Sequence, residues 1–354
     1  MGWIPSLAQR STDTPMRIGV AGLTHTHVHW ILNRAHDGDF EIVGIAEPNK
    51  DLAMRYLKRH RLSEDLWFAS LEEMLDKTQP EAVTAFNAIY EHLETVEACA
   101  PRGIHVMVEK PLAVSNAHAQ KMAALANKHK IHLLTNYETT WYGSNHEVYR
   151  QVVDHSLYGD IRKIVVHDGH PGPIEIGCND EFLEWLTDPV MNGGGALIDF
   201  GCYGANLTTW LMQNQRPLSV TAITQQIKPD KYPKVDDEAT ILLTYPDAQA
   251  IIQASWNWPV SRKDLHVYGK TGYIKTIDGS KMLKRLNEKE PEVAVEAEPR
   301  QSPEDDPFAY FIAIVRGKLS GDNDLSSLAN NLIVVEILDA ARRSSKEGKT
   351  IVME

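Results

Sequence analysis

The first half of the chain alternates short apolar runs with helical stretches of about a dozen residues, and this alternation constrains the fold more than any other feature. The apolar runs predict strands over residues 16–22, 41–46, 82–86 and 104–108, and the segments between and after them predict helices over 28–34, 50–60, 91–100 and 116–129. Strands that alternate with helices in this way form βαβ units around a parallel sheet. Because such sheets bind ligands beyond the carboxyl ends of their strands, functional residues are expected there.

The second half carries further strand-like runs without helices between them. They cover residues 161–167, 220–227, 239–245, 250–256 and 265–268. A run of strands after a βαβ half predicts a second domain built on a large, mainly antiparallel sheet. A final helix is expected over residues 324–343, where aliphatic side chains recur at helical spacing.

Composition excludes several classes of function. The 354 residues include 36 Lys and Arg against 48 Asp and Glu, a net charge of −12, and no basic block that could hold a nucleic acid. The longest apolar run, residues 308–315, is far shorter than the roughly 20 residues of a membrane span. Three scattered cysteines are typical of reduced thiols in a cytoplasmic protein. Residues 1–15 form a polar tail without the apolar stretch of a secretory signal.

The first strand is followed by Gly22-Leu-Thr-His-Thr-His27, at the place where a dinucleotide-binding loop has the sequence Gly-x-Gly-x-x-Gly. Only Gly22 is kept, and Thr24 and His27 stand where the second and third glycines belong. Backbone amides at the start of the next helix can still bind a diphosphate, and the hydroxyls of Thr24 and Thr26 can donate to it. An ordinary strand-to-helix turn is the alternative interpretation.

Two more strand ends carry charged side chains. Glu47 follows the second strand, where a carboxylate accepts hydrogen bonds from an adenosine ribose and repels a 2′-phosphate, so it favours NAD over NADP. A solvent-exposed loop carboxylate is the alternative. Lys110 precedes Pro111, and the residue before a proline is extended, which aims Lys110 beyond the strand end toward a ligand. A lysine in a partly desolvated crevice can lose its proton or donate to a substrate hydroxyl.

Asp199 and Tyr203 are four residues apart, and Asn206 lies about one turn further along the same expected helix. Residues at this spacing share a helix face, so a carboxylate, a phenol and an amide would line one edge. Satisfied polar groups at a seam between domains would give the same pattern.

With these residues in place, the sequence resembles the Gfo/Idh/MocA oxidoreductase family. Residues 108–112 are similar to the family's Glu-Lys-Pro motif, supported by Asn87 and His92 in Asn-x-x-x-x-His. Residues 193–203 match its glycine-rich turn and catalytic helix, and residues 345–352 its closing segment. Tyr203 stands where many members have His and where members of the glucose–fructose oxidoreductase and dihydrodiol dehydrogenase type have Tyr. The resemblance covers nearly all of the chain from Met16 onward.

The resemblance implies an α/β protein of two main domains. An N-terminal Rossmann dinucleotide-binding domain is expected at residues 16–135, and an α+β substrate and oligomerisation domain with a large open, mainly antiparallel sheet at 136–320. Residues 321–354 would supply a helix and strand that pack back on the core. It also implies NAD as the cofactor. The residues expected to bind it are Gly22, Thr24, His25, Thr26, His27, Glu47, Asn87, His92, Glu109 and Lys110.

The resemblance further implies a dehydrogenase or reductase acting on a CH–OH or keto carbon of a sugar, polyol or cyclic diol. Lys110 would hydrogen-bond the reacting oxygen, and Tyr203 would move the proton, with its pKa lowered by the nearby ammonium. Asp199 would orient the substrate or tune the other two. The residues expected to contact the substrate are Trp141, Tyr142, His170 and Asn206.

Two other functions remain open at this stage. The His25-Thr-His27 pattern at a strand end is typical of metal ligands in barrel hydrolases, although histidines that simply line the diphosphate loop explain it as well, and no metal is expected. A dinucleotide-binding sensor without activity would share the fold. The open face of the second sheet is expected to join copies into a homodimer or homotetramer.

Overall fold

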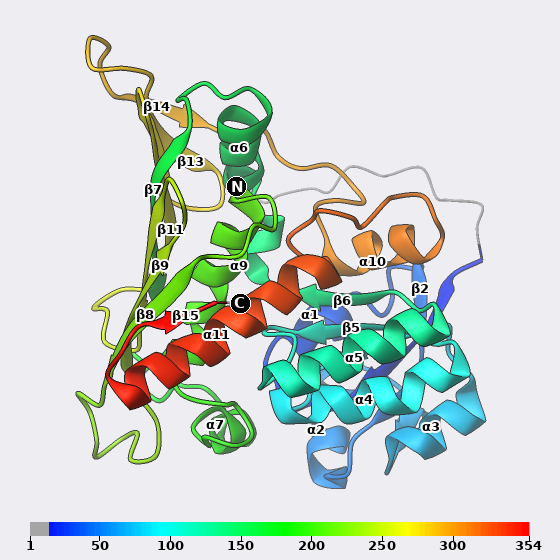
Figure 1. Ribbon diagram of the computed structural model, residues 1–354. Helices are drawn as coiled ribbons and strands as arrows, with labels where there is room; N and C mark the ends of the chain where they lie inside the picture. The colour runs from blue at the N-terminus through cyan, green and yellow to red at the C-terminus, as the bar shows by residue number, and fades with distance from the viewer. Residues whose placement is uncertain (1–13, 354) are drawn as a thin grey trace.

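The computed structural model describes residues 14–353 and confirms the expected parallel sheet in the first half of the chain (Figure 1). The strand order of this sheet is β3-β2-β1-β4-β5-β6, and every neighbouring pair is parallel. Its strands are β1 (Met16–Ala21), β2 (Phe40–Ala46), β3 (Trp67–Phe68), β4 (Ala82–Ala85), β5 (His105–Glu109) and β6 (Leu133–Asn136). Its helices are α1 (Val28–Asn33), α2 (Lys50–His60), α3 (Leu71–Thr78), α4 (His92–Cys99) and α5 (Asn116–His129). The sequence pattern predicts all of these except β3, α3 and β6.

Polar side chains set where two of these helices begin. The Asn49 side chain accepts a hydrogen bond from the backbone N–H of Leu52 at the start of α2, and Ser115 accepts one from His118 at the start of α5. Such caps satisfy N–H groups that have no partner within the helix. In a βα unit the N-terminus of the helix follows the carboxyl end of the strand, so both lie at the ligand-binding edge of the sheet.

The second sheet has the order β14-β13-β12-β11-β7-β10-β9-β8-β15, and it is antiparallel except where β10 pairs with β7. Its strands are β7 (Ile161–Gly169), β8 (Ser219–Gln225), β9 (Glu238–Thr244), β10 (Gln249–Ser255), β11 (Arg262–Gly269), β12 (Tyr273–Thr276), β13 (Lys281–Arg285), β14 (Val293–Glu296) and β15 (Ile351–Val352). The structure confirms the large, mainly antiparallel sheet and extends it by β12, β13 and β14.

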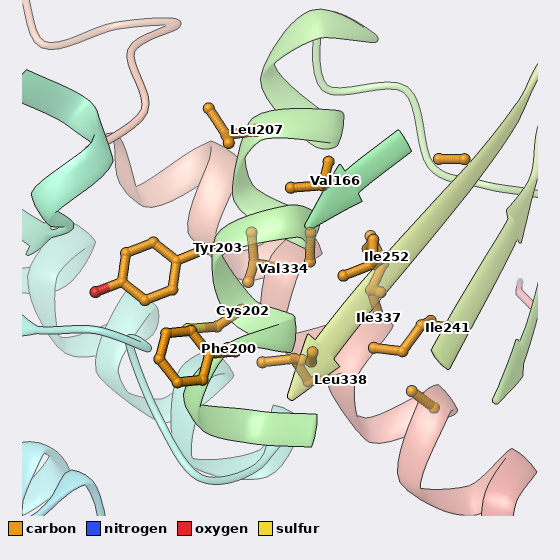
Figure 2. Close-up of a cluster of buried hydrophobic side chains, with 14 of the residues drawn as sticks. Val166, Phe200, Cys202, Tyr203, Leu207, Ile241, Ile252, Val334, Ile337 and Leu338 are labelled. Atoms are coloured by element: carbon orange, nitrogen blue, oxygen red, sulfur yellow. The ribbon is translucent and has the colours of Figure 1, made fainter. Parts of the chain in front are cut away.

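Helices cover only one face of this second sheet. Figure 1 shows α6 (Gly143–Tyr149), α9 (Gly201–Leu211) and α11 (Leu328–Glu347) on the side toward the first sheet, and no helix of the described residues on the other side. In Figure 2, Val166, Ile241 and Ile252 of the sheet meet Val334, Ile337 and Leu338 of α11 in a buried apolar cluster. Burial of these side chains holds the sheet against its helices.

The last part of the chain returns to the first domain. In α10 (Pro307–Val315) the aromatic and aliphatic side chains, Phe308 and Phe311 among them, pack in one core with β1 and β2. The predicted boundaries at residues 135/136 and 320/321 fall just before the end of β6 and after α10, and they stay predictions.

The final helix begins at residue 328 because the Ser327 side chain caps it. Among the described residues, none of the helices combines the length and apolar character needed to cross a membrane.

Candidate active site

A cavity of about 460 Å³ lies between the two sheets, beyond the carboxyl ends of β1, β5 and β6. Eight of the residues singled out from the sequence line it: His25, Thr26, His27, Lys110, Tyr142, His170, Asp199 and Tyr203. Residues more than 170 positions apart in the chain therefore meet in one crevice. Its position agrees with the rule that open parallel sheets bind ligands beyond their strand ends.

Lys110 and Asp199 form a buried ion pair at the centre of the cavity. The Lys110 ammonium contacts the Asp199 carboxylate and also donates to the Asp199 main-chain oxygen at 3.0 Å. Burial opposes the charge of Lys110, but Asp199 outweighs it and raises the pKa of Lys110 above its usual value. Burial likewise opposes the charge of Asp199, and Lys110 and His170 lower the pKa of Asp199. Lys110 is therefore an ammonium, a hydrogen-bond donor, in the resting site.

The turn before Asp199 is shaped by close backbone contacts. Asp199 ends the short helix α8 (Ala196–Asp199) and Tyr203 lies in α9, so the single helix expected from the sequence is divided at Phe200. The Asp236 carboxylate accepts from the backbone N–H groups of Gly195 and Leu197 and caps α8. A side chain at Gly195 would lie 1.8 Å from the backbone oxygen of Asp236, so glycine is required there.

Asp199 has no carboxylate oxygen left without a partner. One oxygen contacts Lys110, and the other accepts from the Trp256 indole N–H at 2.9 Å. The sequence left two roles open for Asp199. This geometry favours the role in which Asp199 raises the pKa of Lys110 over direct contact with a substrate.

Tyr203 differs from the sequence expectation. Its ring is 2% exposed, with the Lys110 Nζ 5.0 Å and the Lys263 Nζ 4.5 Å from the ring centroid. Figure 2 shows its hydroxyl pointing away from the apolar cluster. Burial, followed by the negative charge of Glu138, raises the pKa of Tyr203 well above its ordinary value. The prediction that ammonium groups lower this pKa is wrong, because desolvation of the phenolate outweighs them. Tyr203 is a protonated phenol at rest.

Three further ionisable residues near Tyr203 escape the sequence analysis. Lys263 of β11 lies 3.5 Å from the Tyr203 hydroxyl and contacts the Glu138 carboxylate, which also accepts from the Tyr142 hydroxyl. Asp168 of β7 is fully buried, and neither of its carboxylate oxygens has a hydrogen-bond partner among the described residues. Glu138 follows the end of β6, so the strand-end rule could have found it. No sequence signal points to Lys263 or Asp168.

The loop after β1 is held in place by contacts with the segments that follow β2 and β4. Gly22 has a φ of +78° and donates to the Ala46 oxygen at 2.8 Å, and a side chain at Gly22 would lie 2.6 Å from the Asn87 Cβ. Glu47 is 2% exposed and accepts from Leu23 N and Asn49 N, both at 2.9 Å. Burial raises the pKa of Glu47. The alternative of a solvent-exposed carboxylate is therefore wrong, and Glu47 joins the ends of β1 and β2.

The loop histidines surround Glu109. The Glu109 carboxylate lies 3.0 Å from His27 Nδ1 and 4.0 Å from His25 Nε2, and it accepts from Asn136 Nδ2 at 2.7 Å. Burial opposes the charge of Glu109, but His27 and His25 outweigh it and lower the pKa of Glu109 to about 2. Burial lowers the pKa of His25 well below its usual value. These contacts support the interpretation of the histidines as the lining of the loop. The barrel-hydrolase alternative is wrong in its fold, because the first sheet is open and six-stranded within the described residues.

Several predicted residues do not line the cavity. Asn206 donates to the Leu325 oxygen at 2.8 Å and joins α9 to the segment before α11. It is therefore a hydrogen-bonded polar group at a seam, and the predicted contact with a substrate is wrong. Trp141 donates to Asn136 Oδ1 at 3.0 Å and packs on Tyr310, also outside the cavity lining.

Polar groups around the loop suit a nicotinamide dinucleotide. Asn87, beside Gly22, has a buried Oδ1 without a partner among the described residues, an acceptor for a hydroxyl or amide of a ligand. His92 is also buried, with Nδ1 3.2 Å from the Leu112 oxygen, and burial lowers the pKa of His92 to about 4. Thr26 lines the cavity, whereas the Thr24 hydroxyl lies 3.5 Å from the Phe86 oxygen. The close turn at Gly22 and the unpaired Asn87 Oδ1 fit a bound nicotinamide dinucleotide.

Two family models match the chain. Residues 16–137 match the oxidoreductase family with an NAD-binding Rossmann fold, and residues 146–275 match the GFO/IDH/MocA C-terminal domain. The chain is 29% identical over 185 residues to the trans-1,2-dihydrobenzene-1,2-diol dehydrogenase of Xenopus tropicalis, which covers 52% of each protein. It is 23% identical over 261 residues to the enzyme of the same name from Sus scrofa, which covers 73% of this chain and 72% of that protein. The chain thus spans about half the length of the Xenopus tropicalis relative.

Solved structures share the fold. The aldose-aldose oxidoreductase from Caulobacter crescentus, complexed with glycerol, aligns with a TM-score of 0.80 at 20% identity and covers 96% of this chain and 100% of its own. An inositol dehydrogenase homolog complexed with NAD+ from Azotobacter vinelandii aligns with a TM-score of 0.81 at 17% identity, covering 96% and 98%. At these identities the likeness shows the fold.

Proposed function

The chain belongs to the Gfo/Idh/MocA family of NAD-binding oxidoreductases, and we propose that it is an NAD-dependent dehydrogenase that moves a hydride between nicotinamide and a hydroxyl or keto carbon of a sugar, polyol or cyclic diol. One observation carries the proposal: Lys110, Asp199 and Tyr203 converge in a single cavity beyond the strand ends. The related proteins named as diol and inositol dehydrogenases support the substrate class.

The cofactor, when bound, supplies the hydride acceptor or donor. Gly22, Thr26, Glu47 and Asn87 would hold it at the loop after β1 and the neighbouring strand ends. Lys110, kept charged by Asp199, donates a hydrogen bond to the reacting oxygen and stabilises negative charge that develops on it. Tyr203 holds a proton at its hydroxyl, 3.5 Å from the Lys263 ammonium, and supplies it to the substrate oxygen during reduction.

The protonation states have a consequence for the direction of reaction. Lys110 and Tyr203 both have raised pKa values, so both hold their protons at neutral pH. Reduction of a carbonyl uses these protons as they stand. Oxidation of an alcohol needs one of the two groups to be deprotonated first, so the oxidation rate should rise with pH through the alkaline range. Reduction at neutral pH already has its proton donors in place.

Tryptophan quenching during titration with NADH and NADPH tests the cofactor assignment. Trp30 stacks on His27 with ring centroids 4.0 Å apart, and Trp185 lies 5.8 Å from His25, so binding at this loop should quench both. NADH is expected to bind more tightly, and Trp30→Phe should lose part of the signal without losing affinity. Tighter binding of NADPH would contradict the role of Glu47 and leave the family assignment intact.

A turnover screen with sugars, polyols and trans-dihydrodiols follows the titration. NADH formation or consumption with any of them supports the dehydrogenase. Tight NADH binding without turnover of any compound would favour the sensor that shares the fold. Turnover that survives Lys110→Met at full rate would contradict the site.

We also propose that the open face of the second sheet joins copies of the chain into a homodimer or homotetramer. Ile223 on β8 is 68% exposed there, and Leu242 and Ile251, which pair with each other two positions along the strands on the same face, are half-buried. Light scattering on the eluting protein should give a multiple of the chain mass, and Ile223→Asp should reduce it. The unpaired state of the cysteines supports a cytoplasmic location, which cell fractionation tests.

A further inference from the structure

Two histidines and a carboxylate gather on the face of the second sheet that turns away from the cavity. Strands β7 and β11 are antiparallel neighbours, with His167 opposite Asp264 and Val165 opposite His266. Side chains alternate between the faces of a strand. Lys263 and Asp168 lie on the inner face, near Tyr203, so His167 and Asp264 lie on the outer face.

The three side chains are close enough to share one ion. His167 Nδ1 lies 3.3 Å and His266 Nε2 lies 3.8 Å from Asp264 Oδ2, and the two imidazole rings have centroids 5.2 Å apart. One ligand atom from each residue falls within 4.8 Å of the others. His167 Nδ1 is buried and makes no hydrogen bond of acceptable geometry within the described residues. A nitrogen in that position has a lone pair or proton without a partner, which a metal ion would satisfy.

The surroundings orient these ligands. Arg262 donates to both oxygens of Asp264 at 2.6 Å, and its guanidinium lies 4.7 Å from the centre of the Trp258 ring. Carboxylates that bind metals are commonly held by such a second hydrogen-bond partner. Burial opposes the charge of Asp264, but His167 and Arg262 outweigh it and lower the pKa of Asp264. Burial lowers the pKa of His266, which keeps its imidazole neutral.

The positive charges that face the cluster are already paired. Arg262 is bound to Asp264, and Lys275, the other cation that acts on His266, contacts Glu292 at 3.1 Å. The comparable group of His25, His27 and Glu109 has the Lys110 ammonium among the charges that act on its histidine. It belongs to the cofactor loop. The outer group is therefore the better metal site of the two.

We propose that His167, Asp264 and His266 bind a divalent transition-metal ion such as Zn²⁺ on the outer face of the second sheet. Two imidazoles and one carboxylate are a ligand set that zinc accepts, with further positions left for water or a fourth ligand. The ion would tie β7 to β11 directly behind the strand segment that carries Lys263 and Asp168. The proposal rests on the fold and these side chains, and it is independent of the substrate and of NAD.

Metal titration of the full chain tests this site. The protein is stripped with a chelator, and Zn²⁺ is added while heat of binding and the thermal midpoint are followed, with Co²⁺ as a second probe because its visible absorption reports the ligand geometry. One ion per chain and a rise in thermal midpoint are expected. His167→Gln/His266→Gln should weaken binding at least tenfold and abolish the rise in midpoint.

Matched variants keep the result interpretable. His25→Gln/His27→Gln changes the cavity cluster, and His155→Gln changes an exposed histidine outside both clusters. Both should bind Zn²⁺ as the unaltered chain does. Far-ultraviolet circular dichroism checks that every variant is folded. Absence of one-site binding in the unaltered chain, equal binding in His167→Gln/His266→Gln, or loss of binding in His25→Gln/His27→Gln would overturn the proposal.

Discussion

The inner and outer faces of strands β7 and β11 carry different chemistry although their residues alternate along the same two segments. On the inner face, Asp168 has no hydrogen-bond partner among the described residues, and Lys263 reaches the Tyr203 hydroxyl. On the outer face, His167 and Asp264 lie 3.3 Å apart in one cluster with His266. Consecutive residues of a strand project to opposite faces, so neighbours in sequence can belong to unrelated sites. The face on which a residue lies decides its function here.

The largest expected effect is in the cavity that the inner face lines, at Lys110 after β5. Lys110→Met should reduce turnover about a thousandfold, because it removes the donor that stabilises charge on the reacting oxygen. NADH affinity, measured by tryptophan quenching, should change little. Zn²⁺ binding should not change at all, since the outer face is untouched.

This variant leaves Asp199 buried without its ammonium partner, so Lys110→Met/Asp199→Asn is the control for folding. The double variant should have the higher thermal midpoint of the two and remain inactive. Equal losses of turnover and NADH affinity in the single variant would assign Lys110 to cofactor binding instead.

A smaller effect is expected from Lys263→Met. Its ammonium lies beside the Tyr203 hydroxyl and favours the phenolate, so its removal should shift the alkaline rise of the oxidation rate to higher pH and reduce the rate at pH 8 about tenfold. Lys163→Met is the matched control, because Lys163 lies on the outer face of β7 and donates to Gln249. A pH–rate profile that moves equally in both variants would remove the distinction between the faces.

The third effect is on stability. Burial raises the pKa of Asp168 well above its ordinary value, so the folded chain holds a proton there that the unfolded chain releases above about pH 4. Asp168 therefore destabilises the fold increasingly as pH rises. Asp168→Asn should raise the thermal midpoint at pH 8, by an amount worth about 1–3 kcal/mol, and much less at pH 5.

The comparison of the two pH values is the measurement that matters for Asp168. A gain in midpoint that is the same at pH 5 and pH 8 would show that Asp168 titrates normally. In that case a water or counter-ion, rather than protonation, satisfies its carboxylate.

The smallest effect is expected on the outer face. In metal-free buffer, His167→Gln should leave turnover within twofold and lower stability by no more than about 1 kcal/mol, since it removes one partly exposed contact with Asp264. Steady-state kinetics and thermal melting measure both. A tenfold loss of turnover would mean that a change on the outer face alters catalysis in the cavity, so that the two faces are not independent.

Much of the fold is predictable from the sequence because local patterns carry it. The alternation of apolar runs and helices predicts β1, β2, β4 and β5 with their helices, and Gly22, Glu47 and Lys110 lie at strand ends as expected. The misses have local causes. β3 spans only two residues, which is too short for a periodic pattern, and β12 to β14 carry half-exposed polar positions that obscure the alternation.

The site is predictable only in part. The spacing of Asp199 and Tyr203 brings both into the cavity, although the helix is divided between them. The same spacing places Asn206 correctly on the helix but does not predict that its side chain donates to the Leu325 oxygen and to Asn331 of α11. Periodicity gives the face of a helix that a residue occupies, while the elements packed against that face decide whether it meets a substrate or a carbonyl.

The sequence by itself determined the order of strands and helices, the edge of the sheet where ligands bind and the identity of the Lys110, Asp199 and Tyr203 groups. Only the tertiary structure decided their charge states and neighbours. Tyr203 acquires a raised pKa because burial removes water from its phenolate, and Glu138 and Lys263 reach it from elements distant in the chain. Local patterns record hydrogen-bonding and packing over a few residues, whereas desolvation and charge depend on what the folded chain brings within a few ångströms.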